Sequence, residues 1–255
     1  MSSDILIDRT GAVISICFNR PQKKNALTVA MYEQLIGAFN EAAEARDVRA
    51  ILLKGAGDGF TSGNDILDFM TIEPSLDTPV MRFLRTISCF PKPIVAAVHG
   101  RAIGIGVTML LHCDLVYATP LTAFQLPFVN LALCPEAASS WLLPRIVGYP
   151  KAAELLFLGE RFSGDDALRV GLVNALFPEE RLLSEVATRI DRLVKQPPGS
   201  LRATKWLLKR TMAEEMAEAL QQEAVIFLER VKSPEAMEAF QAFMEKRAPD
   251  FSKFD

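Results

Sequence analysis

Residues Lys92–Thr119, KPIVAAVHGRAIGIGVTMLLHCDLVYAT, give the clearest indication of the fold class. Their first part, Lys92–Gly100, is a short apolar run that ends at a glycine, which is typical of a buried strand. Their last part, Gly106–Thr119, predicts a helix that runs into a second strand. Two buried strands joined through a glycine-rich turn and a helix indicate an α/β core.

Elements of both kinds precede this stretch. Residues 5–21 alternate between apolar and polar and are rich in β-branched side chains around Gly11, which predicts a β-hairpin. Residues 28–45 carry apolar side chains at helical spacing and begin with Thr28, a suitable N-cap, so they predict a helix. We further predict a buried strand over 49–57 and a helix over 79–90.

After about residue 135 the pattern becomes helical or loop-like. Pro197, Pro198 and Gly199 separate the last two helical segments. Neither a low-complexity tract nor an internal repeat is recognisable. The sequence therefore predicts an α/β fold whose β-rich first part is followed by a helical C-terminal portion.

Composition narrows the possible partners. The 255 residues are 50% hydrophobic and 23% charged with a net charge of −3, a globular profile without the basic footprint of a nucleic-acid-binding protein. The four cysteines stand singly in apolar runs, which predicts reduced thiols in a cytoplasmic protein. Two isolated histidines argue against a zinc site. No signal peptide, peroxisomal address or membrane-spanning run is recognisable, so we expect no membrane contact.

Two glycine-bearing turns follow predicted strands, at Gly55–Ile66 and His99–Val107. Together they could aim two backbone N–H donors at one oxygen, which an oxyanion hole requires. For either turn alone, a tight connection between packed elements is the stronger interpretation. A dinucleotide site ranks lower, because Gly104–Thr108 lacks the third glycine and no acidic residue ends a second strand about 20 positions later.

Glu136 is the most conspicuous ionisable residue of the chain. It lies in the apolar segment Leu131–Pro144, LALCPEAASSWLLP. A buried carboxylate without a partner is unfavourable and commonly has a raised pKa. Glu136 is therefore either a residue at the N-terminus of a helix that faces water or an acid–base group.

Five segments together resemble the enoyl-CoA hydratase/isomerase (crotonase) superfamily. They are Asn19–Thr28, Gly59–Ile66, Lys92–Thr119, Gly159–Pro178 and Ala242–Phe251. The resemblance covers nearly the whole chain in the expected order. It implies a spiral of ββα units over residues 1–195 that carries the acyl-CoA site. Residues 196–255 would then form a helical oligomerisation region, in a homotrimer or a dimer of trimers.

The resemblance also implies a binding site for an acyl-CoA substrate. The backbone N–H groups of Asn64 and Ile105 would hold the thioester oxygen. Coenzyme A would be part of the substrate, and no separate cofactor or metal is expected. Coenzyme A or acyl contacts are expected from Lys24, with Lys23 beside it, Ala26, Leu27, Asp65, Ile66, Phe128 and Lys246.

The same comparison separates the possible reactions. Both positions of the usual hydratase glutamates are altered, to Thr108 and Phe128, and these side chains cannot do acid–base work. The segment Pro127–Pro144 resembles the peroxisomal type of Δ3,Δ2-enoyl-CoA isomerase, in which Glu136 would be the single catalytic base. Fatty acid β-oxidation is the context implied. The apolar neighbours Leu133, Trp141 and Leu142 would raise the pKa of Glu136 and exclude water.

Two alternatives stay open at this point. One is a hydratase or another enzyme of the superfamily that uses Asp65 or Asp68, although both carboxylates suit the start of a helix. The other is an acyl-CoA-binding protein without activity. For the remaining candidates we expect core packing from Phe243 and Phe251, a structural hydrogen bond from Asp114 and a helical position for His112.

Overall fold

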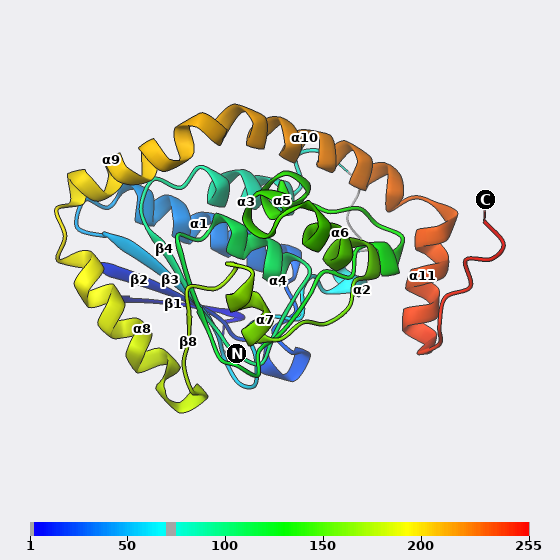
Figure 1. Ribbon diagram of the computed structural model, residues 1–255, viewed down its shortest axis with the longest axis horizontal. Coiled ribbons are helices and arrows are strands. Elements are labelled where there is room, and N and C mark those ends of the chain that lie inside the picture. Colours follow the sequence, from blue (N-terminus) through cyan, green and yellow to red (C-terminus); the bar gives the residue numbers. More distant parts are fainter. Residues whose placement is uncertain (1–2, 70–74, 255) are drawn as a thin grey trace.

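A computed structural model describes residues 3–69 and 75–254 of the chain (Figure 1). Its main sheet has the strand order β1–β2–β3–β4–β6–β8, in which β1 pairs antiparallel with β2 and each later pair is parallel. The strands are β1 (Ile5–Thr10), β2 (Val13–Phe18), β3 (Ala50–Gly55), β4 (Ile94–Val98), β6 (Leu115–Ala118) and β8 (Ala175–Leu176). The hairpin, the buried strands over β3 and β4 and the α/β class that the sequence predicts are confirmed.

The central strand β4 is buried along its whole length, because both faces of the sheet are covered. On one face, Val95 and Ala97 pack with Val186 and Ile190 of α8 (Glu179–Val194). The opposite face supports the main core, in which α1 (Val29–Glu44) packs on α3 (Pro79–Ser88). Thr28 caps α1 as predicted, since its side chain accepts a hydrogen bond from the N–H of Met31.

A second, smaller sheet accompanies the main sheet. It contains β5 (Arg101–Ile103) and β7 (Ala123–Gln125), paired parallel, and single bridges extend it from Ala102 to Thr61 and from Phe124 to Phe162. Each turn of the chain thus contributes one strand to the main sheet and one short segment to this layer. The result is a spiral of ββα units.

Shorter helical elements connect and cover these layers. They are η1 (Pro21–Lys23), α2 (Ile66–Phe69), α4 (Ile105–Thr108), η2 (Met109–His112), η3 (Val129–Leu131), α5 (Ser139–Val147), α6 (Tyr149–Leu158) and α7 (Gly164–Arg169).

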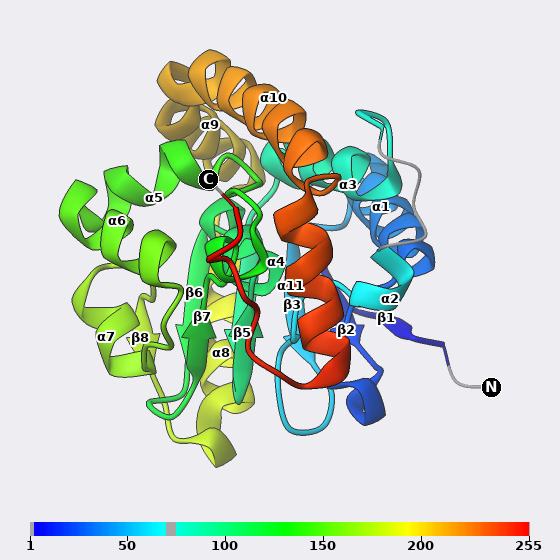
Figure 2. The same cartoon turned by 90° about the vertical axis from the view of Figure 1, so that its right-hand side faces the viewer.

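The helical C-terminal portion wraps around the α/β core. It consists of α9 (Pro198–Lys209), η4 (Arg210–Met212), α10 (Ala213–Arg230) and α11 (Pro234–Glu245). In Figure 1, α9 and α10 arch over α3 and α5, and α11 turns down at the far end. Figure 2 shows α11 and the C-terminal tail on the face that carries α4, and α11 packs against η3. The C-terminal portion therefore covers the region that contains Glu136.

Two local features differ from the sequence-based expectation. The turn His99–Val107 contains a real strand, β5, which is too short and too glycine-rich to show a period-two pattern. If Glu136 stood at the N-terminus of a helix, that helix would begin at Ala137, but α5 starts at Ser139, because Ala137 and Ala138 have φ values of 61° and 56°. Non-glycine residues rarely adopt this left-handed conformation, which costs about 1–2 kcal/mol per residue.

One exposed glycine offers a simple test of the helical core. Gly37 lies inside α1, and a Cβ added there meets no atom within 4 Å. Alanine has the higher helix propensity, so we expect Gly37→Ala to increase the free energy of unfolding by about 0.5–1 kcal/mol. Chemical denaturation monitored by circular dichroism would measure this, and a loss of stability would contradict the packing described for α1.

Candidate active site

Glu136 is buried, with 6% of its surface exposed, and lies in the connection between η3 and α5. The two left-handed alanines that follow it fold the chain back, so that the carbonyl of Glu136 accepts a hydrogen bond from the N–H of Ser139 at 3.1 Å. The carbonyl of Ala137 is also held, by Nε2 of His112 at 2.8 Å. This strained turn directs the carboxylate inward, which excludes the interpretation of Glu136 as a helix-end residue facing water.

The carboxylate of Glu136 accepts a hydrogen bond from the hydroxyl of Thr108, the last residue of α4. Burial raises the pKa of Glu136 to about 8; the hydrogen bond from Thr108 opposes this shift and the charge of Glu223 adds to it. A carboxyl group with a pKa near neutrality can both accept and return a proton. Glu136 therefore has the protonation behaviour of an acid–base group.

The two glycine-bearing turns lie side by side next to α4. Thr61 pairs with Ala102, and the N–H of Ile103 donates to the carbonyl of Thr61 at 3.1 Å. Asn64 and Ile105 each follow this pairing by three residues. Among residues 3–69 and 75–254, the N–H groups of Asn64 and Ile105 have no hydrogen-bond acceptor. Two unpaired backbone donors on adjacent turns are what an oxyanion-binding site needs.

Tyr32 connects this donor pair to the carboxylate. Its buried hydroxyl donates a hydrogen bond to Oδ1 of Asn64. Burial raises the pKa of Tyr32 well above its ordinary value, and the nearby charge of Glu136 raises it further. The hydroxyl thus stays protonated and remains a donor. Asn64, Tyr32, Thr108, Ile105 and Glu136 consequently belong to one site.

The residues predicted to contact coenzyme A adjoin this site. The N–H of Leu27 donates to the carbonyl of Gly63 at 2.8 Å, and the N–H of Asp65 donates to the carbonyl of Leu27 at 2.8 Å. Lys24 and its neighbour Lys23 are exposed, Ala26 is half-buried and Leu27 is buried. The loop that carries the lysines is therefore joined directly to the first donor turn.

Asp65 is engaged in an ion pair. Its carboxylate lies 3.2 Å from Nη1 of Arg20, which also donates to the carbonyl of Ala26 at 2.6 Å. Asp65 precedes α2, which begins at Ile66 and whose backbone includes Asp68. The side chain of Asp68 lies outside the described part of the structure. The arrangement gives Asp65 a structural partner that ties the loop containing Lys24 and Ala26 to α2.

Of the other residues predicted to contact coenzyme A or the acyl chain, Phe128 is buried and Lys246 is exposed. Phe128 is buried in the main core, and its carbonyl accepts a hydrogen bond from the N–H of Leu133 at 2.8 Å. Lys246 is exposed where α11 ends, in a left-handed conformation. Phe243 is 57% exposed, so the core position expected for it is wrong.

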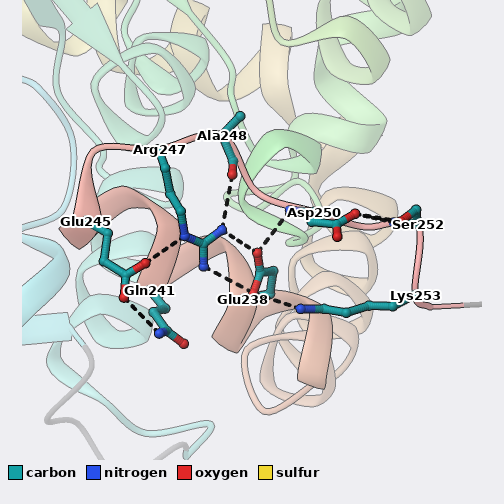
Figure 3. Close-up of polar contacts among 8 residues, drawn as sticks. All are labelled: Glu238, Gln241, Glu245, Arg247, Ala248, Asp250, Ser252 and Lys253. Carbon is teal, nitrogen blue, oxygen red and sulfur yellow. Dashed lines mark hydrogen bonds and ion pairs between the residues drawn. The ribbon is translucent and has the colours of Figure 1, made fainter.

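A compact ionic cluster fixes the chain after Lys246 (Figure 3). Glu238 of α11 pairs with Nη1 of Arg247 at 2.6 Å and with Nζ of Lys253 at 3.2 Å, and it accepts from the N–H of Asp250 at 2.9 Å. The bond from Arg247 is the largest of the effects that lower the pKa of Glu238 to about 2. These contacts fold the tail back onto α11 and fix the position of the chain around Phe251.

Three supporting residues could not be identified from the sequence. Tyr32 is one of several apolar-face residues of a helix, and Glu223 looks like any acidic residue of a surface helix. His112 lies in a segment predicted to be helical, but a helical position does not reveal its hydrogen bond to the carbonyl of Ala137, 25 residues away. Asp114 matches its expected structural role, since Oδ2 accepts from the N–H of Ile94 at 2.8 Å and from Nζ of Lys205 at 2.7 Å.

Other classes of site have little support. In the part of the chain that the structure describes, no three His, Cys, Asp or Glu side chains gather as a metal site requires. No helix within the described ranges has the length and hydropathy needed to cross a membrane. A cavity of about 750 Å³ between α3, α9 and α10 is lined by none of the predicted site residues among those described.

Comparison with known proteins gives a consistent result. Residues 8–253 match the enoyl-CoA hydratase/isomerase family. Over 253 residues the chain is 37% identical to enoyl-CoA delta isomerase 2 of Rattus norvegicus, covering 96% of this chain and 64% of that protein. It is 33% identical to a probable enoyl-CoA hydratase of Bacillus subtilis (strain 168), covering 97% of each. The chain thus spans less than two thirds of the rat relative.

The crystal structure of an enoyl-CoA hydratase/isomerase from Pseudoalteromonas atlantica T6c has the same fold. It superposes with a TM-score of 0.93 at 39% sequence identity, over 98% of this chain and 100% of that one. The family match over nearly the whole length agrees with the ββα spiral and the helical C-terminal portion. The chain therefore belongs to the enoyl-CoA hydratase/isomerase (crotonase) family.

Proposed function

We propose that the protein is an enoyl-CoA isomerase that moves a 3,4 double bond of a fatty acyl-CoA to the trans-2 position. The observation that carries this proposal is the buried carboxylate of Glu136 beside two backbone N–H groups that have no acceptor among the residues that the structure describes. One group with a pKa near neutrality suffices for a reaction that removes and returns one proton.

The proposed reaction is a 1,3-proton transfer. Glu136, as carboxylate, takes a proton from C2 of the 3-enoyl-CoA, and the electron pair moves into a dienolate with its charge on the thioester oxygen. The N–H groups of Asn64 and Ile105 stabilise that charge. Protonated Glu136 then delivers the proton to C4, the carbonyl re-forms and the double bond lies between C2 and C3.

A hydratase is the second candidate, since some relatives bear that name. Hydration needs one group to activate water and another to protonate the α-carbon. Thr108 and Phe128 occupy the positions expected for the hydratase carboxylates, and Asp65 is paired with Arg20. These three observations favour isomerisation. A binding protein without activity is disfavoured by the unusual environment of Glu136.

Three ligands separate these possibilities. Incubation with a 3-enoyl-CoA should give the 2-enoyl-CoA, measured by the absorbance of the conjugated thioester. A hydratase would instead consume 2-enoyl-CoA with loss of that absorbance. A binding protein would take up coenzyme A thioesters, measured by calorimetry, and leave all of them unchanged. The last two outcomes would each refute the isomerase assignment.

Assembly and location complete the proposal. We propose that residues 1–195 form the catalytic core and 196–255 the oligomerisation region of a homotrimer or a dimer of trimers. Trp206, Leu207 and Leu208 of α9 are more than half exposed, which supports self-association. Light scattering coupled to gel filtration would give the oligomeric state. The free thiol of Cys89, which is exposed, is compatible with a cytoplasmic location.

The bond between Tyr32 and Asn64 leads to a prediction about the donor pair. We expect Tyr32→Phe to lower kcat about 10-fold and to leave the KM for acyl-CoA nearly unchanged, because Asn64 loses the hydrogen bond that orients its turn. Steady-state kinetics would test this. Tyr149→Phe is the control, because Tyr149 is 70% exposed on α6. An unchanged kcat in Tyr32→Phe would show that this bond does not orient the donors.

A further inference from the structure

A second buried carboxylate lies beside the turn that presents Glu136. Glu223 belongs to α10, in the helical C-terminal portion, and only 6% of its surface is exposed. Its Oε1 accepts hydrogen bonds from the N–H of Ser140, at 2.7 Å, and from the hydroxyl of Ser140. Its Oε2 is buried and has no partner among the described residues. Burying a carboxylate is unfavourable, so this position calls for a specific role.

The role of Glu223 follows from the position of Ser140 in the first turn of α5. Ser140 is the second residue of α5, and the residue at the N-cap, Ala138, has no side chain that could satisfy the N–H groups there. Glu223 supplies that acceptor from a different helix. His112 holds the carbonyl of Ala137 from the other side. The strained pair Ala137–Ala138 is therefore clamped at both ends, by groups that make no hydrogen bond to Glu136.

We propose that Glu223 is a positioning residue of the active site: through Ser140 it fixes the turn that aims the Glu136 carboxylate at Thr108. This inference rests on the proposed function, in which Glu136 carries the proton. It gives α10 a role in the site, although no residue of α10 takes part in the proposed proton transfer. The C-terminal portion would then contribute to catalysis as well as to assembly.

Glu223 also acts on Glu136 through its charge. The groups that act on Glu136 are the hydroxyls of Thr108 and Tyr32, the thiol of Cys134 and the carboxyl of Glu223, and the imidazole of His112 binds the neighbouring carbonyl of Ala137. Burial lowers the pKa of His112 to about 4 and raises that of Cys134 to about 11, so both are neutral near pH 7. The cations Lys209 and Arg230 act on His112 and Cys134. Burial raises the pKa of Glu223 itself, the hydrogen bonds from Ser140 oppose that shift, and in its ionised form Glu223 is the group whose negative charge raises the pKa of Glu136.

Two substitutions separate the effect of the hydrogen bonds between Glu223 and Ser140 from the effect of the Glu223 charge on Glu136. Glu223→Gln keeps an acceptor for Ser140 and removes the charge. We expect kcat to stay within about 3-fold of the wild type, and the acidic limb of kcat/KM to move to lower pH, because the pKa of Glu136 falls when a negative neighbour is removed. Glu223→Ala removes both features, and we expect kcat to fall by about 10²-fold with a smaller change in KM.

Two controls accompany these variants. Glu229→Gln and Glu229→Ala make the same changes at an exposed residue of α10 and should leave kcat and the pH profile unchanged. Ser140→Ala removes one of the two bonds to Glu223 without removing a buried carboxylate. We expect it to lower kcat about 3-fold to 10-fold, and it keeps the test valid where Glu223→Ala fails to fold.

A readout without turnover distinguishes this inference from the proposed function. Trp141 follows Ser140 in α5, and Trp206 is the other tryptophan of the chain. In a Trp206→Phe background, Trp141 fluorescence should change in Glu223→Ala and return to the wild-type value in Glu223→Gln.

If the wild-type protein does not isomerise 3-enoyl-CoA, the proposed function fails, while the fluorescence still reports whether Glu223 holds the turn. An active protein whose Glu223→Ala variant folds and keeps the wild-type kcat, pH profile and Trp141 emission would overturn the positioning role alone.

Discussion

Replacing Glu136 by glutamine should lower kcat for isomerisation by about 10³-fold to 10⁴-fold, the usual contribution of a general acid–base group. In the proposed reaction the same residue removes the proton at C2 and returns it at C4, so no other group takes over either step. Glutamine has nearly the same shape and its amide oxygen can still accept the hydrogen bond from Thr108. Binding of acyl-CoA should therefore change little. Stopped-flow measurement of the conjugated product and calorimetric titration would give the two quantities.

The pH dependence of the wild type provides a second measurement on the same group. Burial raises the pKa of Glu136 from 4.5 to about 8, and in the proposed reaction the carboxylate is the form that takes the first proton. We therefore expect kcat/KM to rise about tenfold per pH unit below pH 8 and to level off above it. Activity that is independent of pH between 6 and 9 would exclude Glu136 as the base.

Stability should respond to pH in the opposite sense. The folded state favours protonated Glu136, so its contribution to stability is complete below its unfolded pKa of 4.5 and is lost as the pH rises through about 8. Glutamine does not titrate. At pH 8–9 the Glu136→Gln variant should thus unfold at a temperature at least as high as the wild type. Scanning calorimetry would show this, and a clearly lower temperature would mean that lost packing contributes to any loss of activity.

The helices and strands of this fold can be predicted from the sequence better than the contacts between them. Apolar period and glycine position were enough to predict the hairpin, the buried strand β4 and the capped helix α1, because these patterns are local. They could not predict that β5 pairs with Thr61 and β7, since pairing depends on partners far along the chain. The left-handed Ala137 and Ala138 were also hidden, because alanine normally favours a helix.

The candidate active site, too, could be predicted only where its residues stand out in the local sequence. Glu136 could be singled out because a charged residue interrupts an apolar segment, and its burial agrees with that interpretation. Glu223 and Tyr32 could not, since each occupies an ordinary position of an amphipathic helix. Their role depends on which helix face meets the turn, and that is a property of the tertiary structure.

Substituting Gly106 by alanine should lower kcat by about 10²-fold to 10³-fold, the effect of losing one donor of an oxyanion hole. Gly106 follows Ile105 in the first turn of α4, and an added Cβ would lie 2.7 Å from Cγ2 of Thr61 and 3.2 Å from its carbonyl oxygen. Thr61 cannot rotate away, because its hydroxyl donates to the carbonyl of Asn25 at 2.6 Å and accepts from the N–H of Gly63 at 3.1 Å. The first turn of α4 must move instead, and the N–H of Ile105 moves with it.

A second substitution identifies the cause of that loss. Thr61→Ser removes Cγ2 and keeps the hydroxyl, so the double variant Gly106→Ala/Thr61→Ser should recover a large part of kcat. Thr61→Ser alone should stay close to the wild type, and Gly37→Ala controls for a glycine-to-alanine change in a helix with open space around it. Steady-state kinetics of the four variants, with circular dichroism to confirm folding, would complete the test. A Gly106→Ala protein that folds and turns over at the wild-type rate would mean that the N–H of Ile105 does not bind the thioester oxygen.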